Sequence, residues 1–177
     1  MPRRAALLAL FLASFAPAAG AQPPGPDLTR QRAAMLQLSA WAGTWSGEGW
    51  MQRGPERGEF LIHETITPKL DGLALLVEGR GTDKAQPDRV VHQALGVLHY
   101  DETAGGYRFH TWTAEGRSAI ASAEPTPDGF RWWLDVPQGK VNYTVQIKDG
   151  VWTETGEFVG EGQPPRKFLE MTLRKKG

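Results

Sequence analysis

Short runs of β-branched and aromatic residues alternate with turn dipeptides from Trp41 to the end of the chain. This alternation is typical of strands joined by tight hairpins, in which glycine supplies the positive φ of the turn. The turn dipeptides are Asp71-Gly72, Gly105-Gly106, Glu115-Gly116, Asp128-Gly129, Gln138-Gly139 and Asp149-Gly150. The runs begin near Gly43, Gly58, Leu73, Val90, Gly106, Arg117, Gly129, Lys140, Val151 and Lys167. The pattern therefore predicts about ten strands.

The gaps between these runs are too short for a crossover helix, so neighbouring strands are expected to pair antiparallel. An up-and-down meander leaves two unpaired edges, which closure into a barrel removes. A barrel of more than about eight strands is wide enough to enclose a cavity. Outer-membrane barrels need an apolar outer face, whereas polar residues such as Arg131, Asp135 and Asn142 occupy one face here. We predict an all-β fold, a soluble antiparallel barrel of lipocalin-like type.

One segment before the strands has the pattern of a helix. It runs from Leu28 to Leu38, with Thr29 as the expected N-cap and with Met35, Leu36 and Leu38 as an apolar side. A short helix is therefore expected to lead into the first strand.

The N-terminus has the three parts of a secretory signal peptide. Arg3 and Arg4 give a positive start, residues 5–16 are almost wholly apolar, and Ala19-Gly20-Ala21 is the small-x-small pattern of a cleavage site. The apolar run is shorter than the roughly 20 residues that a transmembrane helix needs. We expect cleavage before Gln22, a linker over residues 22–27, a barrel domain over residues 28–177 and no membrane span in the mature chain.

Composition narrows the compartment and the partners. The chain has no cysteine, which excludes disulfides, thiolate metal sites and lipid attachment at the cleavage site. Removal of the two signal-peptide arginines leaves 18 Lys and Arg against 20 Asp and Glu, which offers no basic surface for nucleic acid. The bias towards alanine, arginine, proline and glycine suggests a bacterial protein, so a periplasmic or secreted location is expected.

The first strand opens with a motif rich in glycine around one tryptophan. It reads Gly43-Thr44-Trp45-Ser46-Gly47-Glu48-Gly49. Trp45 is expected to plug the end of the barrel where the helix docks, because it can bury a large apolar area there. Gly43 and Gly47 share its strand face, where absent side chains allow neighbouring backbone to approach closely.

With this motif the chain resembles the lipocalin-like (calycin) superfamily, and within it the nitrobindin-type heme-binding barrels and uncharacterised bacterial relatives. The resemblance runs over Leu36 to Lys176. The segments that carry it are Phe60-x-Ile62-x-Glu64-x-Ile66, Leu70-Asp71-Gly72-x-x-Leu75, Leu98-His99-Tyr100-Asp101 with Tyr107, and Phe168-Leu169-Glu170-Met171-Thr172-Leu173-Arg174-Lys175. It implies a barrel with a cavity.

The same resemblance implies a heme whose iron is held by a histidine near the C-terminal strand. This chain has no histidine there, since its four histidines are His63, His92, His99 and His110. The resemblance therefore supports the fold, whereas this departure weakens the heme interpretation, so no cofactor is expected and heme stays an alternative.

Other chemistry is weakly supported by the sequence. The histidines lie on different predicted strands without an HxH or HxxxH pair, so no metal site is expected. A nucleophile elbow and a Ser/His/Asp set at informative spacing are both missing, and no catalytic residue is predicted.

The remaining candidates are polar and aromatic residues that would face a cavity. His110 and Trp112 share one strand face, and Trp152 and Glu154 share another. Glu64 interrupts the apolar face of its strand. A buried carboxylate is costly unless it is paired, so each glutamate either serves a ligand site or meets an arginine. The candidate arginine partners are Arg80, Arg108 and Arg117.

Three functions are compatible with these residues. The first is an exported barrel that binds a small hydrophobic or amphipathic molecule, held by His110, Trp112, Glu64, Trp152 and Glu154. The second is a heme barrel of nitrobindin type that isomerises reactive nitrogen species. The third is a non-catalytic protein-interaction domain with a filled interior. The volume of the interior separates the third function from the other two.

Overall fold

The computed structural model describes residues 27–177, so the predicted signal peptide and most of the linker lie outside the described residues. The helical elements are α1 (Thr29–Leu36), η1 (Ser39–Trp41) and η2 (Leu70–Gly72). The strands are β1 (Gly43–Arg53), β2 (Glu56–Lys69), β3 (Ala74–Asp83), β4 (Val90–Asp101), β5 (Gly106–Thr113), β6 (Ser118–Thr126), β7 (Gly129–Val136), β8 (Gly139–Lys148), β9 (Val151–Gly160) and β10 (Arg166–Lys175). The predicted strand number is confirmed, with starts within two residues of those expected.

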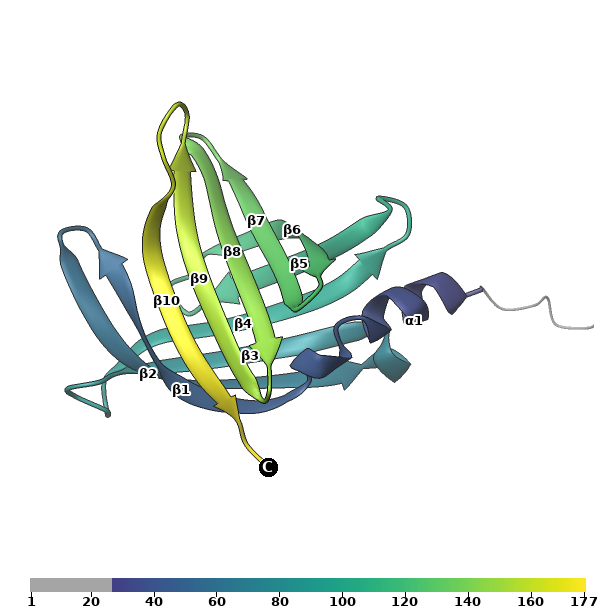
Figure 1. Cartoon of the computed structure of the whole chain (residues 1–177), viewed down its shortest axis with the longest axis horizontal. Coiled ribbons are helices and arrows are strands. Elements are labelled where there is room, and N and C mark those ends of the chain that lie inside the picture. Colours follow the sequence, from purple (N-terminus) through teal and green to yellow (C-terminus); the bar gives the residue numbers. More distant parts are fainter. Residues whose placement is uncertain (1–26) are drawn as a thin grey trace, which may run out of the picture.

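The ten strands form one closed antiparallel barrel in which each strand pairs with its neighbours in sequence and β1 pairs with β10. In Figure 1 the strands β7–β10 run at a steep angle to the strands β2–β4. The β8–β9 hairpin turns through Asp149 and Gly150, whose φ values of 51° and 71° are those of a tight two-residue turn. The prediction of an all-β closed barrel is confirmed.

The β1–β10 pairing depends on glycine at the predicted opening motif. Gly47 lies opposite Leu173, and a Cβ added to Gly47 would come within 1.9 Å of the Thr172 carbonyl oxygen. Since that atom belongs to backbone, the close approach of the first and last strands requires glycine at this position.

Helix α1 and η1 close one end of the barrel, at the right of the barrel in Figure 1. Five aromatic side chains form what we call the floor: Trp41, Trp45, Phe109, Phe130 and Trp152. The indole N–H of Trp45 donates to the Trp41 carbonyl at 2.9 Å, and the Tyr107 hydroxyl donates to the Ala34 carbonyl at 2.8 Å. The closed end is therefore packed with aromatic side chains and tied to the helix by hydrogen bonds.

The start of the helix differs from the prediction. Thr29 is its first residue rather than its cap, and the Thr29 N–H donates to the Asp27 carboxylate at 3.0 Å. The N-cap position is Leu28, whose side chain forms no cap hydrogen bond, so Asp27 supplies the side-chain acceptor that was expected of Thr29. Met35 is buried as expected, whereas Leu36 is 71% exposed because it points away from the barrel.

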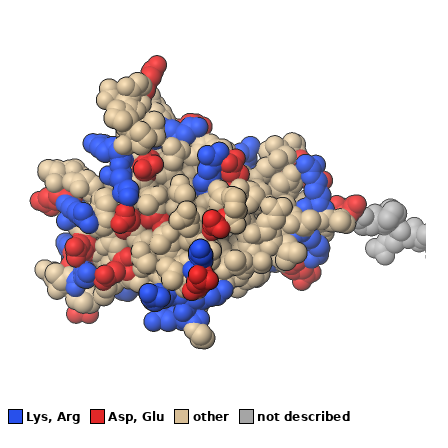
Figure 2. Space-filling view, viewed as in Figure 1, with Lys and Arg blue, Asp and Glu red and all other residues tan. Residues whose placement is uncertain are grey.

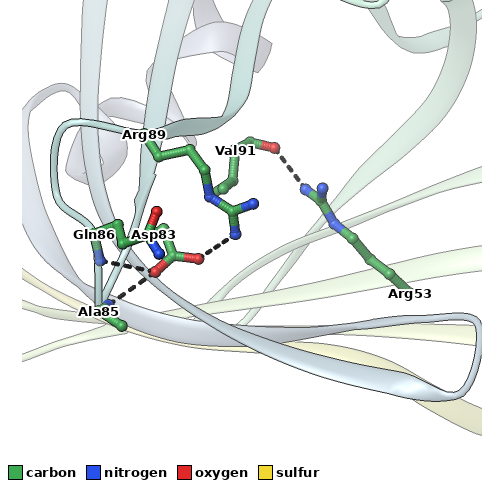
Figure 3. A network of polar contacts seen from close by, with 6 residues as sticks. All are labelled: Arg53, Asp83, Ala85, Gln86, Arg89 and Val91. Atoms are coloured by element: carbon green, nitrogen blue, oxygen red, sulfur yellow. Dashed lines mark hydrogen bonds and ion pairs between the residues drawn. The ribbon is translucent and has the colours of Figure 1, made fainter.

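The other end, which we call the open end, is bordered by the turns at residues 54–55, 84–89, 114–117, 137–138 and 161–165. Asp83 organises one of these turns by accepting hydrogen bonds from the backbone N–H groups of Ala85 and Gln86 and from Arg89. Arg53 of β1 donates to the Val91 carbonyl across the same rim (Figure 3). These contacts join the β1 and β3–β4 parts of the rim.

Side chains that face inward are less buried towards the open end. The floor residues Trp45 and Trp152 are inaccessible to solvent, whereas inward-facing residues nearer the open end are only half-buried. These half-buried residues are Met51, Trp132, Leu134, Tyr143 and Phe168. Because they face the interior of a closed barrel and keep partial exposure, we infer that solvent reaches them through the open end. We call this part of the interior the lumen.

The outer surface carries charges of both signs. Lys and Arg are interspersed with Asp and Glu across the face seen in Figure 2. Several of them pair with each other, such as Arg131 with Glu124 and Lys84 with Glu48. Residues 27–177 contain no helix that is long and apolar enough to cross a membrane.

Candidate functional site

Two carboxyl groups lie inside the barrel beside the floor. Glu64 of β2 is 7% exposed and Glu154 of β9 is 6% exposed. On each strand the neighbours two positions away are buried as well, so both glutamates belong to the inward face. Glu64 lies opposite Trp45 on β1, and Glu154 lies opposite Met171 on β10. Since β1 and β10 pair with each other, barrel closure brings the two glutamates to the same region.

Glu154 is held by a tryptophan. The indole N–H of Trp152 donates to Oε2 of Glu154 at 3.2 Å. Burial raises the pKa of Glu154 to about 7, although the indole groups of Trp152 and nearby Trp132 favour its ionised form. Trp152 therefore contributes both to the floor and to the orientation of a buried acid.

Glu64 occupies space that a glycine leaves open. A Cβ added to Gly79, its neighbour on β3, would lie 2.6 Å from Oε1 of Glu64. Within residues 27–177 the carboxyl group of Glu64 forms no ion pair. Burial raises the pKa of Glu64 to about 8, and the nearby negative charge of Glu154 acts in the same direction. A buried carboxyl group without a partner is costly to fold.

Neither glutamate forms an ion pair within the described residues. Of the two alternatives given by the sequence, the one in which each glutamate meets an arginine is therefore wrong. Arg80 is exposed on the outer wall because it alternates with inward-facing Gly79 and Gly81. Arg108 donates to the Ser122 hydroxyl, and Arg117 pairs with Glu115 in a turn at the open end.

Aromatic side chains line the lumen next to the two acids. The Trp132 and Tyr143 rings stack, with centroids 3.7 Å apart and planes 5° from parallel. Phe168 packs edge-on against Tyr143 at 5.7 Å. Burial raises the pKa of Tyr143, and the charge of Glu154 acts in the same direction, so its hydroxyl stays protonated near neutral pH. The lumen thus offers flat aromatic faces beside carboxyl groups.

His110 and Trp112 share a strand face as predicted, but that face is the outer wall. Trp112 is 44% exposed, and its ring stacks loosely on His110 at 6.4 Å. The alternate residues of β5, Tyr107 and Phe109, are buried inside because they pair with inward residues of β4 and β6. His110 and Trp112 are therefore apart from the lumen.

Trp112 lines a groove on the outer wall instead. The groove has a volume of about 570 Å³ and crosses β2–β5. Its side chains include His63, Thr65, Glu78, Arg80, Gln93 and Trp112. It is wide open to solvent, unlike the region around Glu64 and Glu154.

One inward-facing histidine was not among the residues predicted to line a cavity. His92 lies opposite Gly81 near the open end, and burial lowers its pKa. His92 shares its strand face with Ala94, Gly96 and buried Leu98, because alternate residues of a strand point the same way. This alternation could have indicated that His92 faces inward. The rings of His99 and His110 lie 5.5 Å apart on the outer wall, with their planes tilted by 37°. Within residues 27–177, no three His, Asp or Glu side chains are grouped to hold a metal ion.

Comparison with known proteins supports the fold. No protein-family model matches the chain, and no curated protein matches it. Among solved structures, the chain is similar to Rv2717c from M. tuberculosis, with 16% sequence identity and a TM-score of 0.62. The match covers 81% of this chain and 98% of that chain. At this identity the likeness shows a shared barrel fold alone.

Proposed function

We propose that the chain is an exported barrel that binds a small amphipathic molecule in its lumen. The observation that carries this proposal is the pair of buried carboxyl groups without a cation partner at the base of a solvent-accessible aromatic lining. Export rests on the signal-peptide pattern of residues 1–21, which precede the described part of the chain.

The physical argument starts from the cost of the two acids. Burying a carboxyl group without a partner opposes folding, and such groups are concentrated at functional sites. An incoming ligand with a polar end supplies the missing partner at Glu64 and at the free oxygen of Glu154. Its apolar body then packs on the rings of Trp132 and Tyr143.

Narrowing the lumen is expected to abolish binding. Ala119 faces inward beside Thr111, so Ala119→Phe places a ring in the lumen near the open end. We expect the affinity for the neutral dye Nile red, measured by its fluorescence, to fall by about tenfold or more, which is about 1.4 kcal/mol of binding free energy.

The matched control is Ile120→Phe, which adds a ring to the next residue of β6 on the outer wall. Its Nile red affinity should equal that of the unsubstituted protein. If Ala119→Phe binds Nile red as tightly as the unsubstituted protein, the lumen proposal fails. If Ile120→Phe alone weakens binding, the proposal also fails and the ligand site is on the outer wall.

A heme barrel is the second candidate, because His92 faces the lumen and is partly buried. We rank it second because the resemblance implies a ligating histidine near the C-terminal strand, where the chain has none. Titration with hemin is expected to give no Soret band above that of free hemin. A Soret band that His92→Ala removes and the outer-wall variant His99→Ala retains would reverse this ranking.

A further inference from the structure

We propose that the lumen ligand carries a positively charged nitrogen, which binds between Glu64 and Glu154. This inference rests on the proposed function, since it names the chemistry of the molecule that the lumen would hold. It follows from the two acids, the hydrogen bond that orients one of them, the aromatic faces beside them and the charges that face them.

The two acids lack a cation that the fold itself could have supplied. Glu64 and Glu154 are more than nine-tenths buried, and the ion pairs of residues 27–177 all involve other acids. Arg80 on β3 points outwards, and Arg53, on the inward face of β1, donates to the Val91 carbonyl at the open end instead. A ligand cation would form charge-assisted hydrogen bonds with both carboxylates, and these are roughly twice as strong as neutral ones.

The hydrogen bond at Glu154 leaves one oxygen of the carboxyl group available. Trp152 donates to Oε2 from the floor side. An indole N–H is a donor only, so it stabilises the carboxylate without neutralising its charge. Glu154 is thus oriented as an acceptor for a donor that comes from the lumen.

The adjacent rings suit a cation as well. Trp132 and Tyr143 are stacked and half-buried, and both are close enough to Glu154 for one group to influence the pKa of the other. Tryptophan and tyrosine faces attract ammonium groups, and more strongly when water is excluded. An alkylammonium group could therefore contact a ring face and a carboxylate together.

The other charged and titratable groups around the lumen do not reverse this preference. Tyr143 is neutral. His92, Arg117 and Arg53 lie towards the open end, where Arg117 pairs with Glu115 and Arg53 donates to the Val91 carbonyl. Lys175 lies at the closed end, where its ammonium group is 5.1 Å from the centre of the Trp45 ring and 3.4 Å from the Ala40 carbonyl. An anionic ligand would meet two buried acids at the base of the lumen and be repelled.

Three probes that share one ring test the charge of the ligand: 2-phenylethylamine, 2-phenylethanol and phenylacetate. They are a cation, a neutral molecule and an anion at pH 7.5. Titration followed by tryptophan fluorescence and by calorimetry is expected to show the amine binding at least about tenfold more tightly than the alcohol, with phenylacetate weakest. Proton release should accompany amine binding, because a bound cation favours the ionised carboxylates.

Glutamine substitutions locate the effect. Glu64→Gln and Glu154→Gln keep the shape of the side chain and remove its charge, so each should abolish the preference for the amine over the alcohol. Glu157→Gln is the matched control, because Glu157 is on the outward face of the same strand as Glu154. It should retain the full preference, and thermal melting verifies that all three variants are folded.

Two results would overturn the inference. One is binding of the alcohol or phenylacetate as tightly as the amine. The other is failure of all three probes in a protein that still binds Nile red, which leaves the proposed function standing. If Nile red also fails to bind, the proposed function falls together with the inference.

Discussion

The protein is expected to be more stable at pH 6.5 than at pH 8.5, by about 3 kcal/mol in the free energy of unfolding. The pKa values of about 8 for Glu64 and about 7 for Glu154 lie above the 4.5 of an exposed glutamate. In the unfolded chain both groups are ionised throughout this interval. The folded state therefore binds protons that the unfolded state does not, and this stabilisation is lost as the pH rises through 7 and then 8.

Urea denaturation followed by tryptophan fluorescence at the two pH values measures this difference. The interval avoids the other shifted groups. Asp83, Glu115 and Glu170 have lowered pKa values, so they titrate at more acidic pH. Burial lowers the pKa of His92 from 6.5, so its effect lies mainly below the interval.

Substituted proteins identify the source of the pH dependence. Glu64→Gln should remove most of it, because Glu64 has the more strongly raised pKa. Glu157→Gln should leave it unchanged. Equal stability of the unsubstituted protein at pH 6.5 and pH 8.5 would show that water or a counter-ion reaches the two carboxylates, and that they are not buried as described.

The strands could be predicted from the sequence because hairpin turns and residue alternation are local signals. The turn at Asp149-Gly150 and the strand starts needed no information from distant parts of the chain. The helix was predicted in the right place, but its cap was not, since both Asp27 and Thr29 are good caps and only the backbone decides between them.

The candidate site was predicted only in part, for reasons of geometry. Glu64 and Glu154 stood out as charges on apolar strand faces, yet 90 residues separate them and only closure between β1 and β10 brings them together. The face of β5 was assigned wrongly because both of its faces carry aromatic residues. Tyr107 and Phe109 face inward on that strand, while Trp112 is outside. Local alternation gives two faces but does not say which one is inside.

Trp45→Ala is expected to lower the free energy of unfolding by about 3–5 kcal/mol, the usual cost of deleting a large buried aromatic side chain. Trp45 is fully buried, packs edge-on against Trp152 at 5.7 Å and donates to the Trp41 carbonyl. Alanine leaves a cavity in the floor that the rigid ends of the strands cannot close. The control is Trp133→Ala on the outer wall, which should cost about 1 kcal/mol or less. Denaturation curves at pH 6.5 give both values.

The same substitution should also weaken the pH dependence of stability. Trp45 lies opposite Glu64 in the β1–β2 pairing, so its ring separates the carboxyl group from solvent at the closed end. Without the ring, water reaches Glu64 and its pKa moves back towards 4.5. The stability difference between pH 6.5 and pH 8.5 should then shrink to about half or less. A variant that loses stability but keeps the full pH dependence would show that Trp45 only fills space, and that other groups shield the acid from water.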